Sequence, residues 1–274
     1  TNLYSESVGF GAMVYEALQV ARGDVISFLD DDDEFLPGKL KAVYEAFQRG
    51  ADYYHNGRLV INESGTKLRE EGESALISGE EAKRSWARWL LFHAAFHNSS
   101  SVSVRRRLLG KELKKIDLTP DAYCFVASLL KGDVIVDDPR PLTLFRVHGD
   151  HVGVDLRSRE INEVKRSEAG KRRLQDTFYL YGLARETPYE KVVKYFFINE
   201  KMAWFSRPRR TQLADPIFDR LSIKDVAAWV SYMPYMSGRL TDFWAQLLLP
   251  LLPSWVRELR ATFLFKFFAK EAYR

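Results

Sequence analysis

The stretch from residue 24 to residue 40 constrains the fold more than any other part of the sequence. A short apolar run, DVISFL, leads directly into the four carboxylates Asp30–Asp33, which we call the acidic turn. A continuous apolar run of this length is typical of a strand that is buried on both faces of a sheet. Because four adjacent aspartates repel one another, their place directly behind such a strand needs a structural or a chemical reason.

Helical patterns are expected on both sides of this strand. Before it, GFGAMVYEALQVARG has small and apolar residues at helical spacing, and Gly23 is expected to end this helix as a left-handed cap. After it, Pro37 fits a first helical position and Gly50 a helix end. The buried stripe of the second helix is expected to consist of Leu40, Val43, Tyr44 and Phe47. This order predicts an α/β fold, in which ligands bind at the carboxyl ends of strands.

Two explanations of the acidic turn are open at this point. Asp30–Asp33 could cap the following helix, whose N-terminus favours negative charge, although one or two aspartates would suffice. Alternatively, the carboxylate oxygens could bind Mg²⁺ or Mn²⁺, ions that proteins commonly share between carboxylates and substrate phosphates. The spacing of a calcium-binding loop is absent. We favour the metal–phosphate interpretation.

The segment ARGDVISFLDDDDEFLPGKLKAVYEAF resembles the centre of an inverting family 2 glycosyltransferase of GT-A fold. In these enzymes a strand leads into an Asp-x-Asp motif and then into a helix start of the form aromatic-Leu-Pro-x-Lys-Leu. The resemblance implies that Asp30 and Asp32 hold Mg²⁺ or Mn²⁺ on the diphosphate of a nucleotide-sugar donor, with Asp31 at the diphosphate as well. It also implies donor contacts from Gly9 and Gly11, which lie in a segment similar to the family's Gly-rich loop.

The resemblance continues as far as residue 153. The segment TPDAYCFVASLLKG is similar to the one that supplies the catalytic base, and Asp121 falls on that base. Alternatively, Asp121 follows Thr119 and Pro120, a good helix cap and first helical position, and could only stabilise a helix start. His148 falls on a histidine that in some members of the family reaches the metal or the diphosphate.

The sequence also departs from the family pattern. Pro120 stands where a second acidic residue is usual, and Phe125 where Trp is common. NSSSVSVRRRLL resembles the family's strand that ends in Arg-Arg, and Arg105–Arg107 are expected to form a solvated turn unless one of them faces phosphate. The family's first two strands have no counterpart, so residues 1–153 are expected to be a partial GT-A domain, an incomplete doubly wound, Rossmann-like sheet without most of the nucleobase pocket.

Residues 154–274 are expected to form a mainly helical second region. The first 150 residues carry 19 Lys and Arg against 23 Asp and Glu, whereas the remainder carries 22 against 14. Residues 243–274 combine flanking tryptophans, a Phe-rich helical face and interleaved basic residues, which suits peripheral contact with a membrane surface. The alternative is a terminal helix that packs on the protein. Nucleic acid is not an expected partner, because the basic residues follow no known binding motif.

The function predicted from the sequence is metal-dependent, inverting transfer of a sugar from a nucleotide-sugar to a hydroxyl of a polysaccharide or lipid-linked glycan. Two alternatives stay open: another nucleotide-dependent transferase, and a degenerate, non-catalytic module of glycan assembly. The single cysteine, Cys124, provides no disulfide framework, and no apolar run reaches the roughly 18 residues of a spanning helix. We therefore expect a cytoplasmic protein, with a peripheral location at the inner face of the membrane as the alternative that residues 243–274 leave open.

Overall fold

The computed structural model falls into two compact units, one formed by residues 1–146 and 182–192 and the other by residues 147–181 and 193–274. The residues that the structure describes are 8–72, 74–83, 98–147, 150–151, 154–155, 160–161, 163–206 and 221–231.

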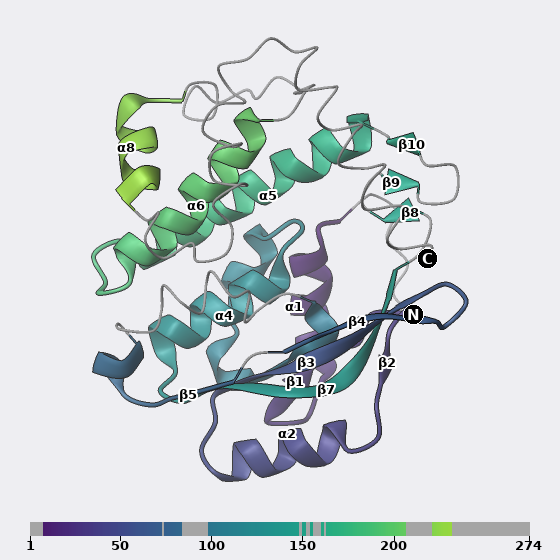
Figure 1. The fold of residues 1–274 in the computed structure, drawn as a ribbon. Coiled ribbons are helices and arrows are strands. Elements are labelled where there is room, and N and C mark those ends of the chain that lie inside the picture. Colours follow the sequence, from purple (N-terminus) through teal and green to yellow (C-terminus); the bar gives the residue numbers. More distant parts are fainter. Residues whose placement is uncertain are drawn as a thin grey trace. The chain divides into compact units, whose positions relative to one another are not determined.

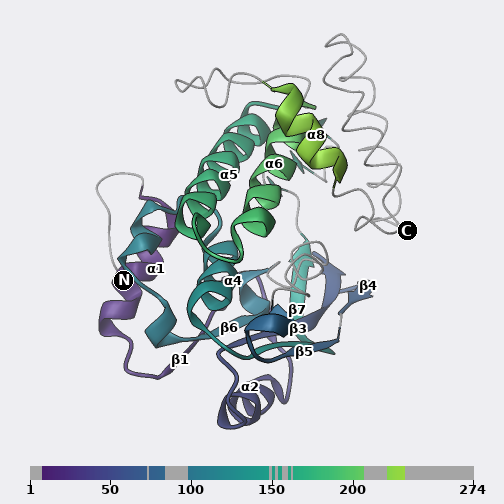
Figure 2. The same ribbon diagram turned by 90° about the vertical axis from the view of Figure 1, so that its left-hand side faces the viewer.

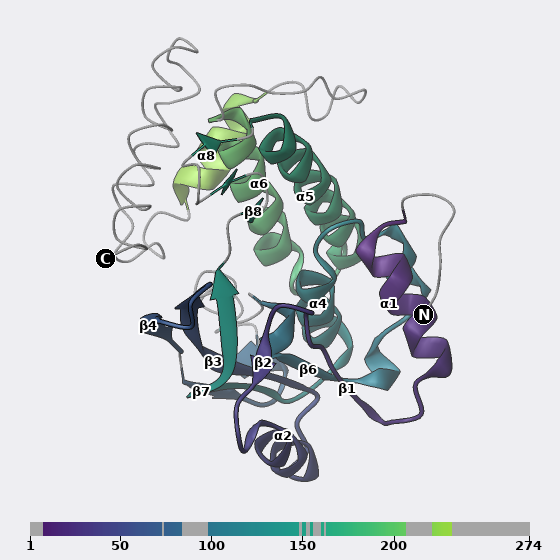
Figure 3. The ribbon, with the colours of Figure 1, turned by 90° about the vertical axis from the view of Figure 1, so that its right-hand side faces the viewer.

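The first unit is built on a seven-stranded sheet with helices on both faces (Figure 1). The sheet follows the order β1 (Val25–Ser27), β6 (Val102–Arg105), β3 (Tyr53–Asn62), β7 (Ile135–Val147) and β2 (Glu34–Phe35), with β4 (Lys67–Glu71) paired to β3 and β5 (Ala75–Ile77) to β7. Helix α2 (Lys39–Gln48) lies on one face, and α4 (Pro120–Lys131), with α1 (Phe10–Val20) beside it, lies on the other (Figure 3). The 3₁₀ turns are η1 (Ser99–Ser101), η2 (Arg106–Leu108) and η3 (Lys111–Lys115).

Strand β1 is formed by the apolar run, but the expectation that it is buried on both faces is wrong. All three of its residues are half-buried. The reason is its place at one end of the strand order, where it pairs antiparallel with β6. The chain then runs through the acidic turn into β2, which pairs antiparallel with β7 at the other end of the order. The acidic turn therefore follows the carboxyl end of a strand, as the sequence indicated.

Helix α2 begins two residues later than expected. Its N-cap is Gly38 at φ 91°, a left-handed conformation that glycine adopts without strain, so Pro37 lies outside the helix. At the other end Gly50, at φ 96°, follows the last helical residue, Gln48, and its C-cap, Arg49, which confirms the predicted end.

The buried face of α2 also differs from the expected stripe. Leu40 and Tyr44 are 62% and 64% exposed, which contradicts the sequence pattern. Instead, Ala42 and Ala46 face the sheet, where their small side chains allow a close approach. The buried residues of this helix are Lys39, Ala42, Val43, Ala46 and Phe47.

Helix α1 ends without a glycine cap. Its C-cap is Ala21 in an extended conformation, with its N–H bonded to the carbonyl oxygen of Ala17 at 3.0 Å. Gly23 has no positive φ, so the predicted left-handed cap at this position is wrong. The chain simply turns into β1.

The second unit contains the helices α5 (Glu163–Ala184), α6 (Glu190–Phe205) and α8 (Ile223–Ser231), together with a small sheet of β8 (Asp150–His151), β9 (Val154–Asp155) and β10 (Glu160–Ile161). Figure 2 shows α5 and α6 side by side, and the rings of Phe178 and Phe197 meet at 5.1 Å. The buried Lys201 of α6 pairs with Asp225 of α8 at 2.9 Å. Within the described residues, no helix combines the length and the apolar character that crossing a membrane requires.

Candidate functional site

The acidic turn is a hydrogen-bonded turn in which burial increases along the chain. The N–H of Asp33 donates to the carbonyl oxygen of Asp30 at 3.3 Å. Asp30 and Asp31 are exposed, Asp32 is half-buried, and Asp33 is only 7% exposed. The first carboxylates of the turn are thus accessible to a ligand, while the last one anchors the turn in the protein.

Turn η1 fixes the first carboxylate. The hydroxyl of Ser99 donates to Oδ2 of Asp30 at 2.5 Å, and the N–H of Asp30 donates to the hydroxyl oxygen of Ser100 at 2.9 Å. A short contact of a hydroxyl with a carboxylate is a charge-assisted hydrogen bond. Both the side chain and the backbone of Asp30 are therefore held by η1, which lies 70 residues further along the chain.

Strand β7 fixes the other end of the turn. The N–H of Arg146 donates to Oδ1 of Asp33 at 3.0 Å, its Nε donates to the carbonyl oxygen of Asp32 at 3.2 Å, and its guanidinium pairs with Glu34 at 2.9 Å. Oδ2 of Asp33 is buried and has no hydrogen-bond partner among the described residues. The Ser100 hydroxyl, whose oxygen accepts the N–H of Asp30, keeps its own hydrogen to donate, and it lowers the pKa of Asp33.

The carboxyl groups of Asp30 and Asp33 both have raised pKa values, mainly because they are partly desolvated. Although the residue Asp30 is exposed as a whole, desolvation of its carboxylate raises its pKa above the ordinary value; the Ser99 hydroxyl opposes this shift, and the charges of Asp32 and Asp31 add to it. Burial likewise raises the pKa of Asp33 against the lowering effect of its hydrogen-bond donors. A cation bound at the turn would reverse both shifts, because it favours the ionised carboxylates.

These residues fit a divalent metal ion that is completed by its substrate. Within the part of the chain that the structure describes, no three acidic, histidine or cysteine side chains converge on one point. Mg²⁺ is commonly bound by one or two carboxylates together with substrate phosphates rather than by an all-protein cage. The exposed Asp30 and the half-buried Asp32 supply two such carboxylates at the strand end, so the residues present fit an ion of this kind.

Asp121 lies in the first turn of α4, with Pro120 as the first helical residue and Thr119 as the N-cap, as the sequence predicted. Its carboxylate is half-buried, and Oδ1 accepts the N–H of Ala122 at 2.8 Å. Burial of Tyr53 on β3 is the main reason why the pKa of Tyr53 is raised, and the charge of Asp121 adds to this shift. Asp121 therefore lies within electrostatic reach of the sheet. The structure thus places it at a helix start, and its role as a base stays a prediction.

The packing of α1 explains why glycine is present at positions 9 and 11. The N–H of Gly11 donates to the carbonyl oxygen of Ile116 at 3.1 Å, where α1 meets the segment of η3. A Cβ atom on Gly11 would lie 2.6 Å from the same oxygen, and one on Gly9 would lie 2.7 Å from Oδ1 of Asp117. Both glycines therefore permit this close approach, and their donor contacts stay a prediction. His148 lies outside the described residues.

The arginines of β6 and η2 are capping residues rather than a solvated turn. Arg105 donates to the carbonyl oxygen of Phe47 at 2.6 Å, at the end of α2, and Arg106 donates to that of Leu18 at 2.9 Å, at the end of α1. The third, Arg107, pairs with Asp52 at 2.5 Å. Cations at helix C-termini satisfy free carbonyl groups and oppose the helix dipole. A pocket of about 560 Å³ at this end of the sheet is lined by Asp24, Gly50, Asp52, Arg105, Arg106 and Arg107.

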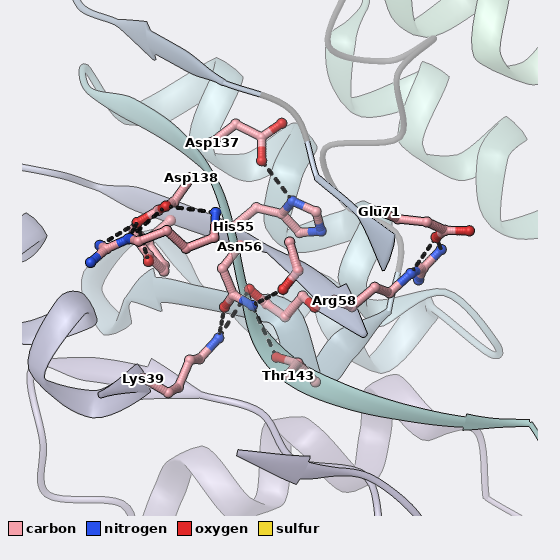
Figure 4. A network of polar contacts seen from close by, with 12 residues as sticks. Lys39, His55, Asn56, Arg58, Glu71, Asp137, Asp138 and Thr143 are labelled. Atoms are coloured by element: carbon pink, nitrogen blue, oxygen red, sulfur yellow. Dashed lines mark hydrogen bonds and ion pairs between the residues drawn. The ribbon is translucent and has the colours of Figure 1, made fainter. Parts of the chain in front are cut away.

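The sequence reasoning missed Lys39, the first residue of α2. Its side chain is 1% exposed, and burial lowers the pKa of its amine to about 7, against the opposing charge of Asp138. The amine contacts Asn56 of β3 and the carbonyl groups of η1 (Figure 4). Lys39 is the lysine of the helix-start pattern aromatic-Leu-Pro-x-Lys-Leu, but no role was predicted for it from the sequence, and burial was not expected because lysine is rarely buried.

Comparison with known proteins identifies the domain that carries this site. Residues 4–109 match the model of the family Glycosyl transferase family 2, whereas no curated protein and no solved structure matches the chain. The matched part includes β1, the acidic turn, η1 and β6. The family match implies a GT-A domain, a Rossmann-like α/β fold, and the sheet with helices on both faces and the acidic turn at a strand end agree with it. Residues 4–109, less than half of the chain, are therefore similar to family 2 of the glycosyltransferases, and this match supports a glycosyltransferase domain in that part of the chain.

Proposed function

We propose that the protein is a metal-dependent, inverting glycosyltransferase that moves a sugar from a nucleotide-sugar to a hydroxyl of a polysaccharide or lipid-linked glycan. The observation that carries this proposal is the acidic turn within the part that matches the family 2 model, held from both sides while the carboxylates of Asp30 and Asp31 stay exposed. The turn does not cap α2, because the N-cap of α2 is Gly38 and the helix begins at Lys39, several residues downstream.

Asp30 and Asp32 would hold Mg²⁺ or Mn²⁺, with Asp31 close to the diphosphate. When bound, the ion neutralises the charge that develops on the departing diphosphate. The protein contributes a fixed geometry: η1 orients the carboxylate of Asp30, and Arg146 holds the backbone of the turn. Because these contacts fix both ends of the turn, little ordering is required when the donor binds.

Asp121 would act as the general base. As the acceptor oxygen attacks the anomeric carbon, its proton passes to the Asp121 carboxylate, the bond from the anomeric carbon to the diphosphate oxygen breaks, and the configuration inverts. The half-buried position at the start of α4 suits this role, because a carboxylate that is partly shielded from water keeps access to a substrate.

The experiment is to measure release of UDP or GDP from a panel of nucleotide-sugars, with acceptors of the glycan class, in Mg²⁺, Mn²⁺ and EDTA. Asp32→Asn should lower turnover by about 10²-fold or more, because removing a charged ligand costs several kcal/mol of transition-state stabilisation. Glu45→Gln, which removes one carboxylate from the outer face of α2, is the matched control and should retain activity. Full activity of Asp32→Asn, or of the wild type in EDTA, would refute the metal-dependent mechanism.

A further inference from the structure

The amine of Lys39 is enclosed by three acceptors. Nζ donates to Oδ1 of Asn56, to the carbonyl oxygen of Ser100 at 3.4 Å and to that of Ser101 at 3.3 Å. Figure 4 shows Lys39 reaching from the start of α2 to Asn56 on β3. Three acceptors match the three N–H groups of an ammonium, whereas a neutral amine has only two.

The acceptors around Lys39 are themselves fixed. Asn56 is fully buried, and its Nδ2 donates to the carbonyl oxygen of Gly57 at 2.7 Å and to the hydroxyl of Thr143 at 3.0 Å (Figure 4). The Thr143 hydroxyl in turn donates to the carbonyl oxygen of Ser100 at 3.1 Å. Lys39 and Thr143 therefore hold the same carbonyl group, and the network connects α2, β3 and β7 to η1.

Burying the charged amine of Lys39 at the start of α2 costs desolvation free energy. The rings of Phe35 and Tyr54 lie 5.3 Å and 5.7 Å from its amine, and the charged groups that face it are Asp138 of β7 and, bonded to Asp138, Arg140. An apolar side chain of similar length would fill the space without the cost of desolvating a charge. The presence of the amine therefore indicates a task beyond filling the core.

The contacts that η1 makes with Asp30 indicate what this task is. The carbonyl groups of Ser100 and Ser101 point to Lys39, whereas the hydroxyls of Ser99 and Ser100 bind the side chain and the N–H of Asp30. One short turn thus connects the buried amine to the first carboxylate of the acidic turn.

We propose that Lys39 is a positioning residue of the acidic turn: it fixes η1, and η1 fixes Asp30 at the end of β1. The importance of Asp30 for sugar transfer rests on the proposed function, but the mechanical link from Lys39 to Asp30 does not. Lys39 acts through η1.

The test is amide hydrogen exchange of the full chain at pH 6, where the amine of Lys39 is mainly charged, comparing wild type with Lys39→Met. The Asp30 amide, which donates to Ser100, and the Ser101 amide, which donates to Asn98 at 2.9 Å, should lose protection at least 10-fold in the variant. Val43→Ala, a cavity variant on the same buried face of α2, is the control for general destabilisation. After the exchange rates are corrected for global unfolding, the Asp30 and Ser101 amides should stay protected in Val43→Ala.

A second measurement needs no variant. Between pH 6 and pH 8.5 the amine loses its proton, because burial has lowered its pKa to about 7, and one of the three acceptors loses its donor. The protection factor of the Asp30 amide in the wild type, corrected for intrinsic exchange, should fall at least threefold over this range, and in Lys39→Met it should stay constant. A general loss of packing would not produce this pH profile.

The transfer assay and the exchange experiment test the proposed function and the role of Lys39 separately. In the transfer assay, Lys39→Met should lower kcat at least 10-fold while the donor KM changes by less than about threefold. If the chain has no transferase activity, the exchange result still decides whether Lys39 fixes the turn. Unchanged protection of Asp30 in Lys39→Met, or an equal loss in Val43→Ala, would overturn the inference, as would a pH-independent protection factor in the wild type.

Discussion

At the scale of single residues, one carboxylate of the acidic turn holds the turn in place, whereas another is available to a ligand. Asp33 is buried and receives a backbone N–H from Arg146, while Asp30 is oriented by Ser99 and remains accessible. Burial raises the pKa of both. A divalent ion would bind more weakly as the pH falls through the range in which these carboxylates take up protons, so metal-dependent activity should decrease on the acidic side.

Asp121→Asn should lower kcat by about 10²-fold or more and leave donor binding nearly unchanged, because only proton transfer is lost. Steady-state kinetics with varied donor give both values. Asp133→Asn is the matched control, since Asp133 is exposed beyond the other end of α4 and its Oδ1, which accepts the N–H of Gly79 at 3.0 Å, is retained. A loss of donor affinity with normal turnover in Asp121→Asn would make Asp121 a binding residue instead.

The sequence identified the acidic turn but not the residues that hold it. The run Asp30–Asp33 is visible because it is local and unusual. Lys39 belongs to the helix-start pattern and Arg105 to the basic run, but these patterns name no partner for either, and only the fold shows that they meet η1 and the end of α2. Partners 60 or more residues apart, such as Lys39 and Ser100, leave no periodic signal in one sequence.

At the scale of elements, α1 depends on a backbone approach that only glycine allows. A Cβ on Gly11 would meet the carbonyl oxygens of Leu113 and Ile116, neither of which can move without shifting η3. Gly11→Ala should therefore cost about 1 to 3 kcal/mol of the free energy of unfolding, as overpacked sites do. Urea denaturation of the full chain measures it.

Gly23→Ala provides the control for this substitution. A Cβ on Gly23 would lie 3.3 Å from the carbonyl oxygen of Val25, its nearest neighbour, and Gly23 has no positive φ. The change should alter the free energy of unfolding by less than about 0.5 kcal/mol. Equal stability of the two variants would show that α1 does not need the close contact with η3.

The helices around the acidic turn and strand β1 could be predicted from the sequence, whereas strands β2 to β5 and the buried face of α2 could not. The order of α1, β1, the acidic turn, α2 and α4 follows from local patterns and cap residues. For α2, the apolar stripe through Leu40 and Tyr44 indicated the wrong face, because the sheet beneath it selects small residues and a hydrogen-bonding lysine. Side-chain hydrophobicity alone does not contain this information.

At the scale of the whole molecule, the prediction concerns residues 243–274, which lie outside the described residues. Their Phe-rich, basic pattern should bring the protein to anionic membrane surfaces. Each Lys or Arg near such a surface contributes about 1 kcal/mol, so binding should weaken as salt rises. A protein at the inner membrane face could bring a soluble donor to a lipid-linked acceptor.

Co-sedimentation with vesicles containing phosphatidylserine tests this prediction. The full chain should pellet at low salt, and a chain that ends at Thr241 should remain in the supernatant. Vesicles of phosphatidylcholine alone are the control for charge. If both chains stay in the supernatant at low salt, residues 243–274 do not bind membranes, and the alternative of a packed terminal helix is favoured.

The central claim, that the acidic turn binds a divalent metal ion on a diphosphate, is tested most directly by anomalous diffraction from crystals soaked in MnCl₂ and inorganic pyrophosphate. Pyrophosphate avoids any assumption about the nucleobase. The account predicts an anomalous peak about 2.1 Å from a carboxylate oxygen of Asp30 or Asp32, the distance expected for a small divalent ion, and no such peak in Asp32→Asn. A wild-type crystal in which manganese occupies other sites and leaves the turn empty would contradict it.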